Sequence, residues 1–247
     1  MSALSKLRPI GERAKIGVII PPSNTVNEAE FNRFAPAGVS FHFTRSPLHA
    51  DPAADDFQQM LSDVKLAMAD LEACRVDYAT YACTAGSMAC PSGRLLRTMS
   101  ETGNIDSSST AQAIIAALSV LGVNKISMAS PYTNDTNTHE AHYLEDHGIQ
   151  VLVTAGLGLN TSLANIQKIS RVPPAEVFTH AKSVDNADAE ALLICCTDFN
   201  TFDAIEPLEA ELGKPVISSN TATLWHSLRS AGIDDRIEGL GTLMRNH

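Results

Sequence analysis

Short runs of apolar and β-branched residues alternate along this chain with longer segments of helical periodicity, a pattern typical of α/β proteins. Because the apolar runs lack alternating polar positions, they predict parallel sheets that helices cover on both faces. In the first half, strands are predicted at 16–20, 39–43 and 78–82, and helices from about residue 26 and over 55–73 and 109–121. In the second half, the predicted strands are 126–129, 151–154, 191–194 and 216–217, and the predicted helices are 139–146, 176–184, 203–212 and 221–231.

The segment 57–73 has the clearest helical period in the chain. Its large apolar residues recur at spacings near 3.6, so we predict that they form one buried face. These residues are Met60, Leu61, Val64, Leu66, Met68 and Leu71.

Matching segments in the two halves indicate an internal repeat. Lys15-Ile16 corresponds to Lys125-Ile126, Cys83 corresponds to Cys196, and 107–111 (SSSTA) corresponds to 218–222 (SSNTA). The three offsets, 110, 113 and 111 residues, are nearly constant. We therefore predict two similar flavodoxin-like α/β halves related by a pseudo-two-fold axis, with the active-site cleft between them. The predicted divisions are an N-terminal tail at 1–14, halves at 15–122 and 123–232, and a C-terminal tail at 233–247 that packs back on the first half.

Both Cys83 and Cys196 follow an apolar strand, and ligands of open parallel sheets bind at the carboxyl ends of the strands. Since side chains alternate along a strand, Cys195 points to the other face and is assigned to the core. Cys74 and Cys90 have no counterpart in the repeat, and we assign them to packing or to the surface.

Small residues after Cys83 suggest how its thiol could work. Thr84, Ala85 and Gly86 let a ligand approach the backbone N–H groups, which stabilise a thiolate or a bound carboxylate. The alternative is that each cysteine is a small buried apolar residue. The repeat favours function, because two opposed thiols can transfer a proton between the faces of a carbon. They can equally let one thiol attack while the other protonates.

Two other polar residues at strand ends have two readings each. Asn24, in the loop 21–25, either caps the next helix or bonds a ligand oxygen. Tyr132, in the corresponding loop of the second half, either donates a hydrogen bond into the cleft or packs.

Composition limits the classes of partner. The net charge of −10 over 247 residues, without a Lys/Arg cluster, argues against nucleic acid. No apolar run is long enough for a membrane span, residues 1–13 lack the core of a signal peptide, and five cysteines do not form a secreted disulfide framework, so we expect a cytoplasmic protein. The pair His139 and His142 lacks further ligands and is expected on a solvated face rather than at a metal. No nucleotide-binding glycine motif occurs, and we expect no cofactor.

Four motifs together resemble the aspartate/glutamate racemase superfamily, and most closely its maleate cis–trans isomerase branch, with the arylmalonate decarboxylases as neighbours. The motifs are 16–25 (IGVIIPPSNT), 81–84 (YACT), Cys196-Thr197 and 215–220 (PVISSN), and the resemblance runs from about residue 15 to 232.

The resemblance implies roles for individual residues. Cys83 and Cys196 match the two catalytic cysteines, of which arylmalonate decarboxylases typically keep only the second. Asn24 and Tyr132 match positions that hold a substrate carboxylate in the isomerases, and Thr84 and Thr197 match donors of the carboxylate pocket. One departure is a loop asparagine of the isomerases, which aligns near Thr161-Ser162, where this chain has hydroxyl groups, with Asn160 nearby. Ser162 is therefore the expected substrate-binding residue at this position.

The expected function is therefore isomerisation of a small carboxylate such as maleate, with Cys83 adding to the alkene and Cys196 acting as acid and base. The alternatives are a two-thiol racemase of an amino acid, hydantoin or related acid, an arylmalonate decarboxylase-like enzyme, and a non-catalytic ligand-binding protein. The resemblance also implies a homodimer.

Overall fold

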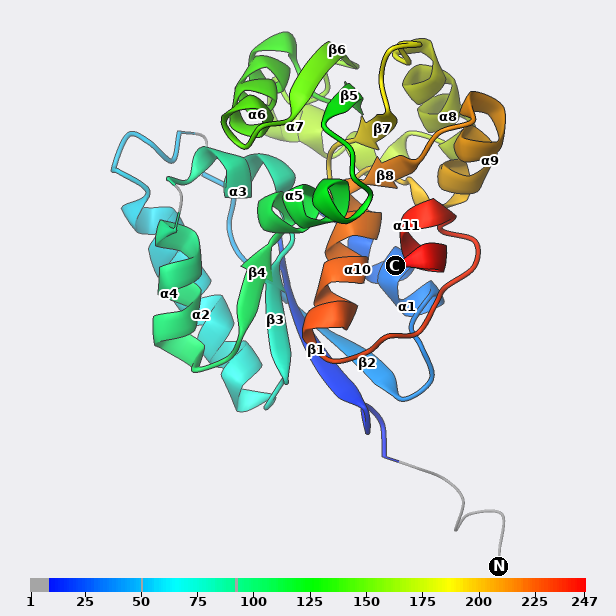
Figure 1. Cartoon of the computed structure of the whole chain (residues 1–247). Coiled ribbons are helices and arrows are strands. Elements are labelled where there is room, and N and C mark those ends of the chain that lie inside the picture. Colours follow the sequence, from blue (N-terminus) through cyan, green and yellow to red (C-terminus); the bar gives the residue numbers. More distant parts are fainter. Residues whose placement is uncertain (1–8, 50, 92) are drawn as a thin grey trace, which may run out of the picture.

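Two four-stranded parallel sheets form the frame of the protein in the computed structural model, which describes residues 9–49, 51–91 and 93–247 (Figure 1). The strand order is β2-β1-β3-β4 in the first sheet and β6-β5-β7-β8 in the second. In each sheet the first strand of its half, β1 or β5, lies between the next two strands of that half and pairs with both. The prediction of two similar parallel α/β halves is confirmed.

The elements follow the predicted order closely. The strands are β1 (Ala14–Ile20), β2 (Val39–Arg45), β3 (Tyr78–Tyr81), β4 (Ser107–Ser109), β5 (Lys125–Ser130), β6 (Gln150–Gly156), β7 (Ala191–Ile194) and β8 (Val216–Ser218). The helices are α1 (Asn27–Arg33), α2 (Gln58–Ala73), α3 (Thr84–Ala89), α4 (Arg94–Gly103), α5 (Thr110–Val120), α6 (Asn134–Asp146), α7 (Leu163–Ile166), α8 (Pro174–Ser183), α9 (Phe202–Leu212), α10 (Ser219–Ser230) and α11 (Gly241–Asn246), with a short 3-10 helix at Ile169–Arg171.

Helix α2 carries one correction. Its predicted apolar face is buried except for Leu66, whose side chain is 67% exposed. Leu66 lies two residues from both Val64 and Met68, and residues two apart point to opposite sides of a helix. The prediction that Leu66 belongs to the buried face was wrong for this reason.

The repeated Ser-Ser-x-Thr segments have the same local structure in both halves. Each ends a strand and starts a helix through a capping box, in which Ser109 accepts from the Gln112 N–H and Ser218 accepts from the Thr221 N–H. The cap lets each chain segment turn sharply from sheet to helix at the end of the strand where ligands of such sheets bind.

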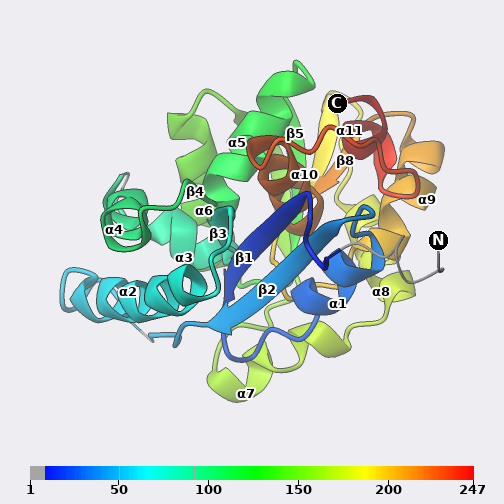
Figure 2. The same ribbon diagram turned by 90° about the horizontal axis from the view of Figure 1, so that it is seen from below.

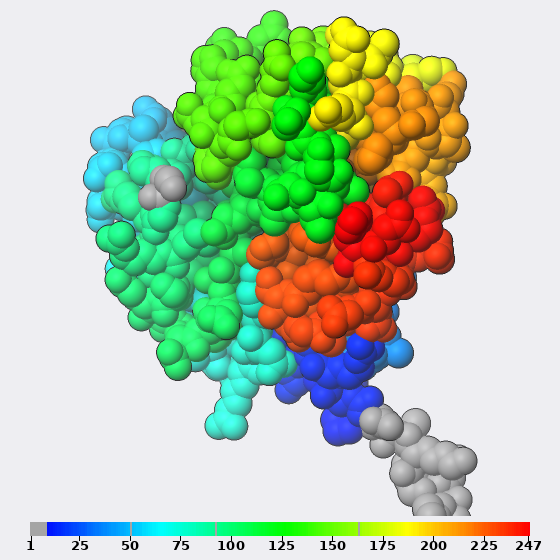
Figure 3. Space-filling model, in the orientation of Figure 1, coloured from blue at the N-terminus to red at the C-terminus, as the bar shows by residue number. Residues whose placement is uncertain are grey.

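Helix α10 does not stay with the second sheet. It packs against β3 of the first sheet and alongside α5, as Figures 1 and 2 both show. The C-terminal helix α11 contacts α9, β8 and α10 and covers part of the surface beside them (Figure 3). Just before α11, Asp235 pairs with Arg13 of the first half. The division of the chain at residue 122 stays a prediction. Among the residues described, no helix is both long and apolar enough to cross a membrane.

Candidate active site

Cys83 lies where β3 ends and α3 begins. Its backbone is extended, with φ −143°, and its residue occupies the position before the first turn of α3. The side chain is 8% exposed. Because a Cβ built on Gly86 would lie 3.1 Å from the Cys83 sulfur and 3.0 Å from the Tyr81 hydroxyl, only a glycine fits beside this thiol without displacing it.

Cys196 lies at the corresponding end of β7, but its backbone differs. It has φ +91°, the left-handed region that side chains other than glycine rarely adopt. Such strain concentrates at functional sites, where the surrounding structure holds it in place. One support is the Ser219 hydroxyl, which accepts a hydrogen bond of 3.1 Å from the Cys196 N–H. The neighbouring Cys195 is fully buried, as its assignment to the core predicts.

Cys83 lies close enough to Cys196 for its charge to raise the pKa of the second thiol. Burial raises the pKa of Cys83 to about 11, although hydrogen bonds from the Gly86 backbone and the Tyr81 hydroxyl oppose the shift. Burial raises the pKa of Cys196 further, and the charges of Asp198 and Cys83 add to the effect. Cys83 is therefore the thiol that ionises more readily.

Tyr132 contacts the second thiol directly. Its hydroxyl hydrogen-bonds the Cys196 sulfur and so lowers the pKa of that thiol, against the larger effect of burial. The ring is buried, and burial raises the pKa of its own hydroxyl well above the usual value. Both readings of Tyr132 therefore hold, because the ring packs and the hydroxyl donates into the site.

Asn24 caps the next helix, and its bond to a ligand oxygen stays a prediction. Its side-chain oxygen accepts from the N–H groups of Val26 and Asn27 at the start of α1, at 3.1 and 3.0 Å. Its amide group donates to the Thr197 hydroxyl of the other half, at 3.2 Å. Through these hydrogen bonds the fully buried Asn24 joins the β1–α1 loop to the loop after Cys196.

The threonines that follow the two cysteines cross between the halves. The Thr84 hydroxyl donates to Ser219 at 2.8 Å, and the Thr197 hydroxyl donates to the Ala82 carbonyl at 2.9 Å. These bonds fix the two cysteine loops against each other. Ala85 is partly exposed beside Thr84, where its small side chain leaves the backbone accessible.

Asp198 is a site residue that the sequence prediction missed. One carboxylate oxygen accepts from the Thr25 N–H at 2.9 Å, and the other has no hydrogen-bond partner among the described residues. Burial raises its pKa to about 6, against hydrogen bonds from the Thr25 and Val26 backbone. The sequence does mark this position, because Asp198 is an acidic residue directly after a strand whose neighbouring residues are apolar or small.

Arg45 at the end of β2 was also missed. Its guanidinium donates to the Asn24 and Pro21 carbonyls, at 2.8 and 3.3 Å, and thereby holds the β1–α1 loop. Its positive charge also lowers the pKa of Asp198, although burial has the larger and opposite effect.

The loop after β6 carries Ser162, whose contact with the substrate stays a prediction. Ser162 is exposed and its hydroxyl accepts from Asn165 at the start of α7, so nothing described links it to either thiol. The neighbouring Asn160 instead accepts from the Thr133 N–H and donates to the Thr136 hydroxyl. Asn160 is thus the residue that ties this loop to the segment that carries Tyr132.

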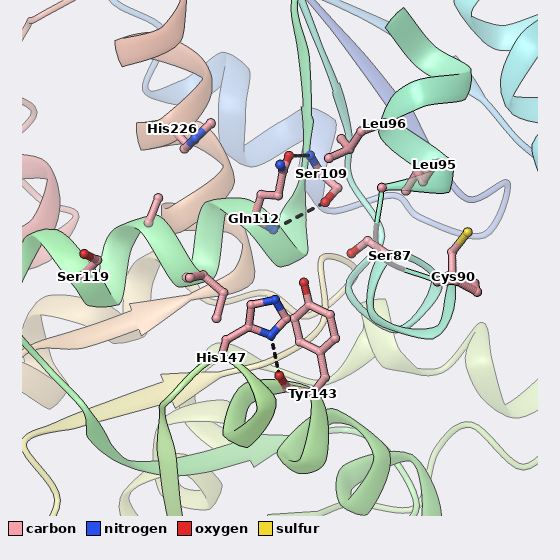
Figure 4. A pocket seen from close by; sticks show the side chains of 14 residues that line it. Ser87, Cys90, Leu95, Leu96, Ser109, Gln112, Ser119, Tyr143, His147 and His226 are labelled. Carbon is pink, nitrogen blue, oxygen red and sulfur yellow. Dashed lines mark hydrogen bonds between the residues drawn. The ribbon is translucent and has the colours of Figure 1, made fainter.

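A surface hollow of about 490 Å³ opens between α3, α5, α6 and α10 (Figure 4). Ser87, Gln112, Tyr143, His147 and His226 are among its lining residues, but neither Cys83 nor Cys196 is. The thiols instead lie beneath the surface where the two halves meet. Within the described ranges, no group of His, Cys, Asp and Glu side chains could hold a metal ion, and His139 and His142 are exposed.

Comparison with known proteins gives consistent relatives. The family model described as arylmalonate decarboxylase matches residues 16–244. A maleate isomerase of Alcaligenes faecalis is 26% identical over 248 residues, which cover 93% of this chain and 96% of the relative. An arylmalonate decarboxylase of Bordetella bronchiseptica is 28% identical over 136 residues, which cover 54% of this chain and 55% of that protein.

Solved structures share the fold. A mutant of Nocardia farcinica maleate cis–trans isomerase with a covalently bound succinylcysteine intermediate matches with a TM-score of 0.84 and 24% identity, over 95% of this chain and 99% of that one. An arylmalonate decarboxylase structure matches with a TM-score of 0.82 and 24% identity, over 94% of this chain and 100% of that one.

Proposed function

The chain belongs to the arylmalonate decarboxylase family, which the motifs indicated as a neighbour of the maleate isomerase branch, and we propose that it is a cysteine isomerase that converts maleate to fumarate. The observation that carries the proposal is the pair of buried thiols at equivalent strand ends, Cys83 and Cys196, which lie close enough for the charge of Cys83 to raise the pKa of Cys196. Relatives that match almost the whole chain are maleate isomerases.

The proposed reaction begins at Cys83, which ionises more readily than Cys196. The Cys83 thiolate adds to one alkene carbon of maleate and forms a C–S bond, while the π electrons move onto the other carbon and its carboxylate. Cys196 then donates its proton to that carbon, which leaves a succinyl thioether on Cys83 and a thiolate on Cys196. The former double bond is now single and rotates.

Reversal of these steps from the rotated form gives the product. The Cys196 thiolate takes back a proton, the double bond reforms in the trans geometry, and Cys83 leaves as a thiolate. No atom is gained or lost, so the two thiols alone complete the cycle. Tyr132 stabilises the Cys196 thiolate through its hydrogen bond whenever that thiol is ionised.

The substrate carboxylates need hydrogen-bond donors, because the chain carries a net charge of −10. We assign this role to the backbone N–H groups of Thr84, Ala85 and Thr197 and to the second amide hydrogen of Asn24. The hydroxyl groups of the two threonines already donate within the protein. Their cross-half bonds hold the cysteine loops in place before the substrate arrives. A contact between the substrate and the exposed Ser162 hydroxyl stays a prediction.

The deciding experiment incubates the protein with maleate and follows fumarate by proton NMR. We expect turnover in the wild type and in Cys90→Ala, a control thiol with no place in the proposed mechanism. Loss is expected in Cys83→Ala and in Cys196→Ala. Full turnover in both of these last variants would disprove the two-thiol mechanism.

A racemase is the second candidate, and Asp198 is the observation that favours it. The partnerless oxygen of Asp198 lies near Cys196 and suits an ammonium group of an α-amino acid. In this reaction one thiolate removes the α-proton and the other thiol returns a proton on the opposite face. Incubation with chiral α-acids in D₂O separates the candidates, because a racemase incorporates deuterium at the α-carbon with inversion. An arylmalonate decarboxylase-like activity would instead release CO₂ from an arylmalonate added to the same panel.

We also expect a homodimer in the cytoplasm. Light scattering after gel filtration measures the first, since a molar mass near twice 26.4 kDa is expected. Cell fractionation measures the second.

A further inference from the structure

Each half of the chain contains an Asn-x-x-Glu pair. The pair in the second half lies next to the thiols, and the proposed mechanism does not use it. Asn27 and Glu30 in α1 have the same spacing as Asn137 and Glu140 in α6, and the two pairs are 110 residues apart, as the repeat requires. All four side chains are buried. The two glutamates occupy equivalent positions in the two halves, so their surroundings can be compared directly.

Glu30 is fully partnered. One of its oxygens accepts from the N–H groups of Thr201 and Phe202, both at 2.8 Å, and the other accepts from the Asn220 amide at 2.6 Å. These donors all belong to the second half of the chain. Glu30 therefore joins the halves and has an evident structural role.

Glu140 lacks such donors. It is 0% exposed, and neither carboxyl oxygen accepts a hydrogen bond of ordinary distance and angle from the described residues. Within the described part of the chain, the Cys195 thiol is the group that interacts with it at close range. A carboxylate buried without donors is strongly disfavoured, so the neutral acid is the stable form.

The groups around Glu140 are those of the site. Helix α6, which carries it, packs against α3, the helix that Cys83 precedes, and against β6. The titratable groups that it influences are Cys195 at the end of β7, Cys83, and Tyr132 in the β5–α6 loop, and a negative charge on Glu140 raises the pKa of each. Around Cys83 the other such groups are Tyr81, Cys196 and Asp198.

We propose that Glu140 is a positioning residue that keeps a proton beside the thiol pair, and that its ionisation determines whether Cys83 can carry the negative charge that the reaction needs. While Glu140 is neutral, a thiolate that forms at Cys83 meets no negative charge from this side chain. Once Glu140 ionises, a second negative charge opposes both the thiolate and an anionic substrate. Burial raises the pKa of Glu140 to about 8, with partial opposition from Cys195, so this inhibition begins at mildly alkaline pH.

The test follows thiol ionisation without substrate, so it does not depend on the proposed function. Iodoacetamide labelling of Cys83 is measured by mass spectrometry between about pH 7 and 10 in the wild type, in Glu140→Gln and in Glu30→Gln. In Glu140→Gln the removed charge should lower the pKa of the Cys83 thiol by about one pH unit. Labelling near pH 9, which lies below that pKa, should then be about tenfold faster than in the wild type. Glu30→Gln is the matched control, and we expect it to lower the melting temperature and leave the labelling curve unchanged.

A merely structural role for Glu140 would lower the melting temperature of Glu140→Gln without moving the labelling curve, and that result overturns the proposal. If the variant does not fold, ¹³C NMR of glutamate-labelled protein serves in the wild type and in Glu30→Gln. A glutamate that titrates near pH 8 in both supports the proposal. Because burial raises the pKa of Glu30 to about 7, the refuting result is read in Glu30→Gln, where no glutamate would titrate above about pH 7. Turnover of maleate is then measured separately, and its absence would count against the proposed function only.

Discussion

Removal of one hydroxyl group from the site, in Tyr132→Phe, tests the role of the second thiol most directly. The phenol hydrogen-bonds the Cys196 sulfur, and the proposed cycle leaves Cys196 as a thiolate while the substrate is attached to Cys83. Phenylalanine keeps the buried ring and removes only this donor. The backbone bond of residue 132 to the Ser130 hydroxyl, at 3.0 Å, stays available.

The expected size of the effect follows from the charge on the acceptor. A hydrogen bond to a charged group contributes about 1.5–3 kcal/mol. Since about 1.4 kcal/mol corresponds to a factor of ten in rate, kcat should fall by about tenfold to a hundredfold. The thermal stability should change little, because no cavity is created and the lost partner is a sulfur that is neutral in the resting site.

The assay is the initial rate of fumarate formation, with iodoacetamide labelling of Cys196 as a second readout. Tyr143→Phe is the control, because its hydroxyl belongs to the surface hollow and not to the thiol site (Figure 4). The reasoning is refuted if Tyr132→Phe folds normally and turns over at the wild-type rate. It is equally refuted if Tyr143→Phe loses as much activity as Tyr132→Phe.

Three further predictions concern ionisation and packing. Burial raises the pKa of Cys83 to about 11 and that of Cys196 further, so iodoacetamide labelling of both thiols should accelerate up to about pH 11. Cys83 should be labelled faster than Cys196 at every pH, and the opposite order would contradict this prediction. Burial raises the pKa of Glu140 to about 8, so its contribution to stability is complete below about pH 4.5 and is lost as pH rises through 8. Calorimetry should therefore show a melting temperature that falls over this pH window, and that falls less in Glu140→Gln. In Gly156→Ala the new Cβ would lie 2.1 Å from a backbone oxygen of the β5–α6 loop, so chemical denaturation should show that the free energy of unfolding falls by about 1–3 kcal/mol. Gly158→Ala should lose less, because its Cβ meets nothing within 4 Å and only the φ of +69° opposes the change.

The sheets and most helices could be predicted because their signals are local. Buried strands such as Ala191–Ile194 are short apolar runs, and α2 has a regular period. Strand β4 (Ser107–Ser109) was missed because three serines have little intrinsic preference for a strand. They form a strand because they pair with β3. Helix α6 begins at Asn134, five residues before the predicted start, because its polar first turn is anchored by Asn137, which accepts a hydrogen bond from Ser130.

The candidate site could be predicted only where the repeat marked it. The repeat picks out Cys83 and Cys196 and separates Cys196 from Cys195. It could not reveal which side chains meet across the halves, such as Asn24 and Thr197, because those contacts depend on how the two sheets are placed. Glu140 could have been found from the duplicated Asn-x-x-Glu spacing, but its lack of donors is visible only in the folded protein.

The crossing of α10 onto the first sheet affects how far the two sides of the site, one from each half of the chain, can differ in sequence. If identical half-chains assembled in this way, they would form a helix-exchanged dimer, and every substitution would appear on both sides. One continuous chain removes that constraint. Asp198 stands where the first half has Ala85, and Tyr132 stands where it has Pro22. The covalent connection thus permits a division of labour, with one thiol reserved for attack and the other for proton transfer.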